Sequence, residues 1–196
     1  MNSPFADHTR EVFCAFGVVA YCTQIFEADL LTMLILLERL GKIDASVSED
    51  PASWLTPKLC AHSWLELSKE TEHELSRKTL GGLLKELAED VRKDLQHLIE
   101  RESTVIPKEI LKTLVQILDE IPFQEWFQAL ERRNYLFHEF FFQHETELCN
   151  DEGCRKLLEE MRGDKTLFED CVIQVRSFTD RLLKVFGVDK SQLLAG

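Results

Sequence analysis

The chain has 196 residues, with 23 Lys and Arg residues against 35 Asp and Glu residues, and its formal net charge is −12. This length permits a hydrophobic core that needs neither disulfides nor metals. A composition that is 44% hydrophobic and 30% charged excludes a disordered or fibrous chain. The negative net charge excludes nucleic-acid binding through the electrostatic field of the whole protein, so any contact with nucleic acid has to depend on a local group of basic residues.

The first forty residues predict one buried helix. Ser3-Pro4 matches a helix cap followed by proline at the first helical position, and the apolar pattern continues to Leu40, where Gly41 supplies a stop. The apolar run 12–22 has the length of a signal-peptide core, but acidic residues precede it and no cleavage site of small residues follows. The run is then interrupted by three polar residues, Gln24, Glu27 and Asp29. We therefore expect a soluble core helix and no membrane association.

The remainder of the chain also reads as helices joined mostly by short connections. Residues 42–76 are the least regular part and predict an irregular insert with short helical turns. Leucines at helical spacing up to Leu98 predict a helix that opens at Thr79 and ends at 100–104, and Pro107 and Pro122 bracket the next one. Three further helices are expected: a long aromatic-rich one over 123–148, a short one over 154–161, and a last one from Gly163-Asp164 to Phe186.

This pattern predicts an all-α bundle of about five main helices. No run of four to eight alternating residues indicates a strand, and no internal repeat is evident. We expect a single domain over 1–196. The six cysteines show no spacing typical of a disulfide framework, which indicates free thiols in a reducing, cytoplasmic compartment.

The segment 126–142 is the most informative part of the sequence. On a helix with about 100° per residue, its apolar residues form one stripe within about 40° of Leu130. That stripe comprises Phe123, Trp126, Leu130, Phe137, Phe141 and Leu148. Arg133, Asn134 and His138 lie on its borders, and Asn134 and His138 are four residues apart, so that their side chains can hydrogen-bond.

Two interpretations of these polar residues stay open. In the structural one, Arg133 pairs with an acid of a neighbouring helix and His138 donates a hydrogen bond to a backbone carbonyl. In the functional one, the group lines a groove that receives an anion. Arginine binds phosphate through two parallel hydrogen bonds, and histidine transfers protons near neutral pH. Together they suit phosphodiester chemistry without a metal.

The run Arg133-Asn134-Tyr135-Leu136-Phe137-His138 resembles the signature of the HEPN superfamily, the higher eukaryotes and prokaryotes nucleotide-binding domains. That signature is an arginine, a polar residue and then a histidine a few residues on. The flanks are also similar, with Leu130 before the motif and an aromatic run at 140–142 after it, and the stretch at 79–84 is similar to a helix opening in some members.

The resemblance implies an all-α HEPN-like bundle and two alternative functions. Many members are metal-independent endoribonucleases of toxin–antitoxin and other defence systems, which dimerise to form one composite cleft. On that basis His138 assists proton transfer, Arg133 stabilises charge on the phosphate oxygens, and Asn134 orients His138 or contacts the phosphate. The expected partners are a second copy, RNA, and an antitoxin or other protein. Other members are non-catalytic modules that dock a partner protein, and the acidic surface is consistent with that alternative.

We weighed two metal sites and expect neither. His144, Cys149 and Cys154 recur at five-residue steps, whereas zinc ligands usually come in closer pairs. In the insert, one helix face would gather Glu66, Glu70, His73 and Glu74. Carboxylate-bridged metal sites need such a motif on two helices, and here it occurs once. No glycine-rich phosphate loop is present, so no cofactor is expected.

Overall fold

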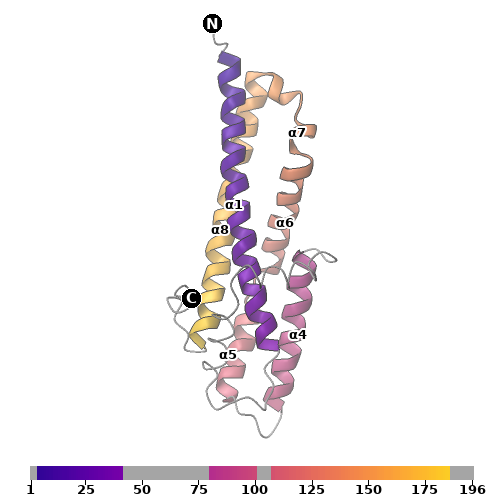
Figure 1. Ribbon diagram of the computed structural model, residues 1–196, viewed down its shortest axis with the longest axis vertical. Coiled ribbons are helices and arrows are strands. Elements are labelled where there is room, and N and C mark those ends of the chain that lie inside the picture. The colour runs from indigo at the N-terminus through magenta and orange to yellow at the C-terminus, as the bar shows by residue number, and fades with distance from the viewer. Residues whose placement is uncertain (1–3, 42–79, 101–106, 186–196) are drawn as a thin grey trace. The chain divides into compact units, whose positions relative to one another are not determined.

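The computed structural model describes residues 4–41, 80–100 and 107–185, and this part of the chain is helical, with no strand (Figure 1). The predicted all-α helical bundle is confirmed. The elements are α1 (Pro4–Gly41), α4 (Leu80–Glu100), α5 (Lys108–Asp119), α6 (Phe123–His138), α7 (Phe140–Gln143), the 3-10 turn η1 (Glu147–Cys149) and α8 (Asp151–Val185). The predicted insert over 42–76 and the predicted cap at Ser3 lie outside the described residues.

Proline and glycine set several helix boundaries where the sequence predicts them. Helix α1 begins at Pro4 and ends at Gly41. Pro107 precedes α5, and its carbonyl accepts hydrogen bonds from the backbone N–H of Ile110 at 3.0 Å and of Leu111 at 3.3 Å. Proline suits this position because a helix start leaves its own N–H groups without partners.

The prediction of one helix over 123–148 is wrong, because the helix breaks at Glu139. That residue has φ −126° and ψ −28°, and α6 ends just before it. Three consecutive phenylalanines span too wide an arc to be buried on one side of a continuous helix. After the break, Phe140 is completely buried and Phe141 stacks on Phe13, with ring centroids 5.0 Å apart, whereas Phe142 stays 86% exposed.

The prediction of two helices over 154–161 and 164–186 is also wrong, because α8 runs without interruption from Asp151 to Val185. Gly163 lies inside it, exposed to solvent. An exposed glycine costs a helix only about 1 kcal/mol relative to alanine. Fully or almost fully buried residues on both sides of it, Met161 and Phe168 among them, supply more than that by packing.

The helices form two compact units, which α1 and α8 both enter. The first unit comprises residues 1–30 and 124–175. In Figure 1, α1, α6 and α8 lie side by side within it. Contacts between Phe26 and Phe168 and between His8 and Asp151 show that α1 and α8 run parallel. Helix α6 runs antiparallel to α8, since Trp126 donates a hydrogen bond to Gln174 at 2.8 Å and Arg132 binds Asp164.

The second unit comprises residues 31–123 and 176–196 and contains α4 and α5. Arg92 and Asp119 form an ion pair of 2.8 Å between these helices, and Arg181 pairs with Glu120 at 2.8 Å. Its described core is mostly aliphatic and draws on four helices, with buried residues that include Met33, Leu36, Val91, Leu95, Leu111, Leu114, Ile117, Leu118, Leu182 and Leu183. A single domain over 1–196 stays a prediction.

Within α1, the segment His8–Leu34 is long and apolar enough to cross a membrane by length and composition. The core helix of a soluble protein passes the same test. Several side chains of this segment of α1 pack inside the first unit. Val19, Phe26 and Leu30 are fully or almost fully buried, and buried Thr23 donates its hydroxyl proton to the carbonyl of Ala20 at 2.7 Å.

The described cysteines are free thiols in two kinds of environment. Cys14 and Cys149 are exposed, whereas Cys22, Cys154 and Cys171 are buried. Burial raises the pKa of Cys171 to about 11 and also raises the pKa of Cys22. A thiol reacts as its thiolate, so reactivity should follow this division.

We predict that iodoacetamide at about pH 8 modifies Cys14 and Cys149 first and Cys171 slowest in the folded protein. Mass spectrometry of time points would give the rates. In denaturant all these thiols should react alike, and a Cys171 that reacts as fast as Cys14 in the folded state would contradict the buried position.

A close approach of backbones fixes the start of α8. Gly153 donates its N–H to the side-chain oxygen of Asn150 at 2.7 Å, and a Cβ at Gly153 would lie 2.3 Å from the carbonyl oxygen of Glu147. That neighbour is backbone and cannot rotate away. At Gly163, in contrast, a Cβ would meet nothing within 4 Å.

We therefore predict opposite effects for the same substitution at these two glycines. Gly153→Ala should lower the free energy of unfolding by about 2 kcal/mol, through a steric overlap. Gly163→Ala should raise it by about 0.5–1 kcal/mol, because alanine loses less conformational entropy in a helix. Urea denaturation followed by circular dichroism measures both, and equal effects would contradict the predicted contact.

Candidate functional site

The last turns of α6 carry Arg133, Asn134 and His138, the three residues that the sequence singles out. All belong to the first unit. Asn134 and His138 are exposed to solvent, and the Arg133 side chain is 31% exposed. His138 is the last residue of α6, directly before the break at Glu139. The structure therefore places the three residues at one end of one helix, open to solvent.

Arg133 is partly neutralised within the chain. Its Nε lies 3.0 Å from Oε1 of Glu27 on α1, and its Nη1 donates a hydrogen bond of 2.9 Å to the side-chain oxygen of Asn134. The guanidinium also lies over the ring of Phe137, 5.3 Å from its centroid. The structural interpretation of Arg133 as an ion-pair partner is thus realised, yet the group still reaches the surface.

Asn134 and His138 do not pair as the spacing suggests. The side-chain oxygen of Asn134 accepts from Arg133, and no side-chain hydrogen bond links Asn134 to His138. Among the described residues, the His138 side chain also makes no hydrogen bond or ion pair with another side chain or with the backbone. Asn134 therefore orients the arginine and not the histidine, and the imidazole stays available for an external ligand.

The apolar stripe predicted around Leu130 is realised only in its first half. Trp126 is fully buried and Leu130 nearly so, but Phe137 is 42% exposed. Phe137 contacts Phe16 of α1 edge-on, with ring centroids 6.2 Å apart. Beyond the break at Glu139, Phe141 contacts the same ring at 4.6 Å. An aromatic surface therefore adjoins the polar residues.

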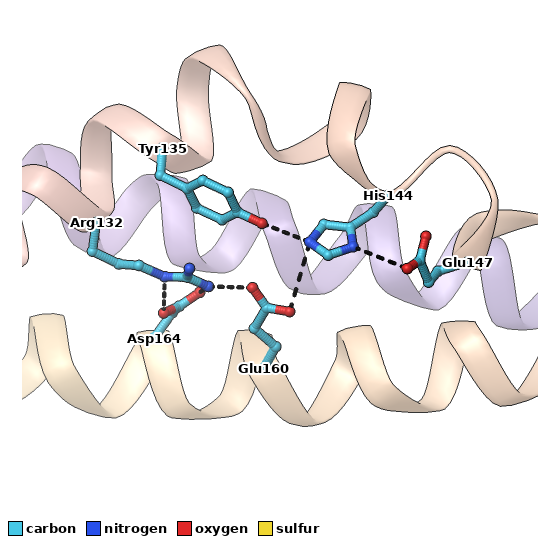
Figure 2. Close-up of polar contacts among 6 residues, drawn as sticks. All are labelled: Arg132, Tyr135, His144, Glu147, Glu160 and Asp164. Carbon is cyan, nitrogen blue, oxygen red and sulfur yellow. Dashed lines mark hydrogen bonds and ion pairs between the residues drawn. The ribbon is translucent and has the colours of Figure 1, made fainter.

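The neighbouring arginine, Arg132, points to the other side of α6 and anchors it to α8 (Figure 2). Its Nε and Nη2 donate to the two oxygens of Asp164 at 2.6 and 2.8 Å, and Nη2 also donates to Glu160. Partial burial opposes the positive charge, but the bonds to Asp164 and Glu160 outweigh it and raise the pKa of Arg132. Sequence spacing alone does not distinguish this arginine from Arg133.

Tyr135 and His144 extend this anchor, as Figure 2 shows. The Tyr135 hydroxyl and Nε2 of His144 form a hydrogen bond of 2.6 Å, and Nε2 lies 3.9 Å from Glu160. Burial and the charge of Glu160 raise the pKa of Tyr135. Nδ1 of His144 is buried, makes no hydrogen bond with any residue that the structure describes, and lies 3.8 Å from Glu147. The network ties α6 and η1 to α8.

The structure does not bring together His144, Cys149 and Cys154, for which the sequence analysis expects no metal site. His144 bonds to Tyr135, while Cys149 is exposed and the Cys154 thiol lies 3.8 Å from the Thr9 hydroxyl. In the described ranges, no group of three or more His, Cys, Asp or Glu side chains could hold a metal ion. The other candidate set, Glu66, Glu70, His73 and Glu74, lies outside the described residues.

Sequence reasoning missed Glu27 as a member of this site. Glu27 only interrupts an apolar run in the sequence, and nothing local indicates that it faces a residue more than a hundred positions away. Beside the carboxylate of Glu27, the site offers the partly exposed guanidinium of Arg133, the amide of Asn134 and the imidazole of His138. Such a set can bind an oxyanion and transfer a proton.

The two arginines should differ in their effect on stability. Arg132→Met should lower the free energy of unfolding by about 3 kcal/mol, because buried Asp164 loses its counter-charge. Arg133→Met should cost less than about 1 kcal/mol, since its pair with Glu27 is half-exposed and methionine keeps the aliphatic stem. Chemical denaturation of both variants measures the difference, and equal losses would contradict this assignment.

Comparisons of the chain with protein-family models, with curated proteins and with solved structures find no match. A function for this protein is therefore inferred from the contacts of Arg133, Asn134 and His138.

Proposed function

We propose that this protein is a HEPN-like, metal-independent endoribonuclease whose site is built on Arg133, Asn134 and His138. One observation carries the proposal: in the described part of the chain, the exposed imidazole of His138 has no side-chain partner, and Arg133, partly exposed at the same end of α6, has N–H groups that make no hydrogen bond. Side chains that only stabilise a fold normally satisfy one another, as Arg132, Asp164 and Glu160 do.

The chemistry required is the attack of a ribose 2′-hydroxyl on the adjacent phosphorus. A base removes the hydroxyl proton, the bond to the 5′-oxygen breaks, and an acid protonates that oxygen. Arg133, held by Asn134, stabilises the negative charge that grows on the two remaining phosphate oxygens. No metal is needed, because arginine supplies the charge and histidine the proton transfer.

A second copy would complete this site. One imidazole cannot act as base and acid in the same step, so two copies of His138 facing each other supply both. The surface beside the motif suits such pairing, since Phe13 is 51% and Phe137 42% exposed. Exposed aromatic side chains in one area are typical of a protein interface. We therefore propose a homodimer, acting in the cytoplasm, where free thiols are stable.

A second function, a non-catalytic module that docks a protein, is favoured by a different observation. Glu27 already compensates Arg133, and the chain has a net charge of −12, so a basic partner protein would be attracted to it. In that case the aromatic surface would contact the partner protein.

Cleavage of RNA in EDTA tests the catalytic proposal. We predict that the purified protein cleaves mixed RNA with EDTA present, and that Arg133→Ala and His138→Ala each lower the rate by at least about 100-fold. Matched controls are Arg155→Ala and His97→Ala, which remove exposed side chains of the same types elsewhere.

The controls should cleave at the wild-type rate. Equal, residual cleavage by all five proteins would indicate a contaminating nuclease and would contradict the proposal. Absence of cleavage together with capture of a basic partner protein that survives Arg133→Ala would favour the docking module.

Sedimentation analysis tests the dimer separately. Phe137→Glu places a charge in the aromatic surface and should convert a dimer into a monomer, with the helical circular dichroism spectrum retained. Ile173→Glu is the matched control, because Ile173 is a 65% exposed apolar residue on α8. A wild-type monomer, or a dimer that survives Phe137→Glu, would contradict this interface.

A further inference from the structure

The carboxylate of Glu27 lies where an anionic ligand of Arg133 would bind. Its Oε1 is 3.0 Å from Nε of the guanidinium, and the Glu27 and Arg133 side chains are 29% and 31% exposed. Both residues belong to the first unit. A phosphate that uses the same edge of the guanidinium therefore meets this carboxylate first.

The pair of Glu27 with Arg133 is poorly aligned. Nε of Arg133 is buried and, despite its 3.0 Å distance from Glu27, makes no hydrogen bond of acceptable geometry within the described ranges. Arg132 differs, since it donates two bonds of 2.6 and 2.8 Å to the two oxygens of Asp164. Charge-assisted hydrogen bonds are strongest in that two-point arrangement. Glu27 thus compensates the charge of Arg133 without forming a well-aligned hydrogen bond. An anion that forms such bonds can therefore displace it.

Glu27 also cancels the charge that an incoming phosphate needs. The charge of Arg132 is already matched by Glu160 and Asp164. Arg133 and Glu27 together sum to zero, so the motif offers no net positive charge while they are paired. Because part of the Glu27 side chain reaches solvent, its carboxylate can turn into water when a better anion arrives.

We infer that Glu27 is an intramolecular competitor that occupies Arg133 in the resting protein and is displaced by the phosphate group of the ligand. The inference rests on the proposed function for the identity of that ligand. A competitor and a positioning residue predict opposite effects on anion binding when the charge of Glu27 is removed. If Glu27 held Arg133 in a binding geometry, its neutral replacement would weaken the binding of anions, whereas a competitor predicts tighter binding.

The test compares Glu27→Gln, which keeps shape and removes charge, with Glu131→Gln, which removes the same charge from an exposed position on α6. The probe is a fluorescein-labelled 2′-O-methyl RNA oligonucleotide, which lacks the attacking hydroxyl. Fluorescence anisotropy should show binding about tenfold tighter for Glu27→Gln and changed less than about twofold for Glu131→Gln. Adding Arg133→Ala to Glu27→Gln should remove the gain.

Unchanged or weaker binding by a folded Glu27→Gln protein, beside wild-type binding that depends on Arg133, would overturn the inference and leave the proposed function standing. If no variant binds RNA, the proposed function fails, and sulfate decides the inference. The inference is supported if sulfate raises the Tm of Glu27→Gln but not that of the wild type or of Glu27→Gln/Arg133→Ala. If sulfate causes no such rise, the inference is overturned.

Discussion

The ion pair between Arg132 of α6 and Asp164 of α8 is the interaction on which the candidate site depends. Asp164 is buried, and a buried carboxylate is tolerated only when a counter-charge and hydrogen bonds replace its water. Meeting that requirement fixes the rotation of α6 about its own axis. Because Arg133 is the next residue, about 100° further around the helix, the same contact turns Arg133 towards α1 and the surface.

The two adjacent arginines thus have different roles: Arg132 anchors α6 to α8, and Arg133 reaches the surface. Arg132 is paired with two carboxylates through its Nε and Nη2, whereas Arg133 has a single, misaligned carboxylate and an amide. The division follows from the geometry of a helix, on which consecutive residues face different neighbours. It also explains how Arg133 stays partly accessible in an acidic protein, because Glu160 and Asp164 pair with Arg132.

The sequence predicted the helical class and most helix ends, because periodic leucines and the prolines and glycines act locally. The prediction was wrong where tertiary packing decides the structure. At Glu139, the helix breaks and Phe140 becomes buried. At Gly163, packing on both sides keeps α8 continuous, although glycine is a poor helix former. Arg133, Asn134 and His138 could be singled out from a local motif. Glu27 could not, since its partner is distant in sequence and no local pattern marks it.

The break at Glu139 separates the end of α6 from the aromatic segment after it. In a continuous helix, every insertion or deletion beyond His138 would rotate the downstream aromatic residues relative to Arg133 and strain one set or the other. Beyond the break, buried Phe140 and the hydrogen bond between His144 and Tyr135 hold the segment in place, so that it can change mainly at exposed positions such as Phe142 and Glu145. We expect natural variation to concentrate there.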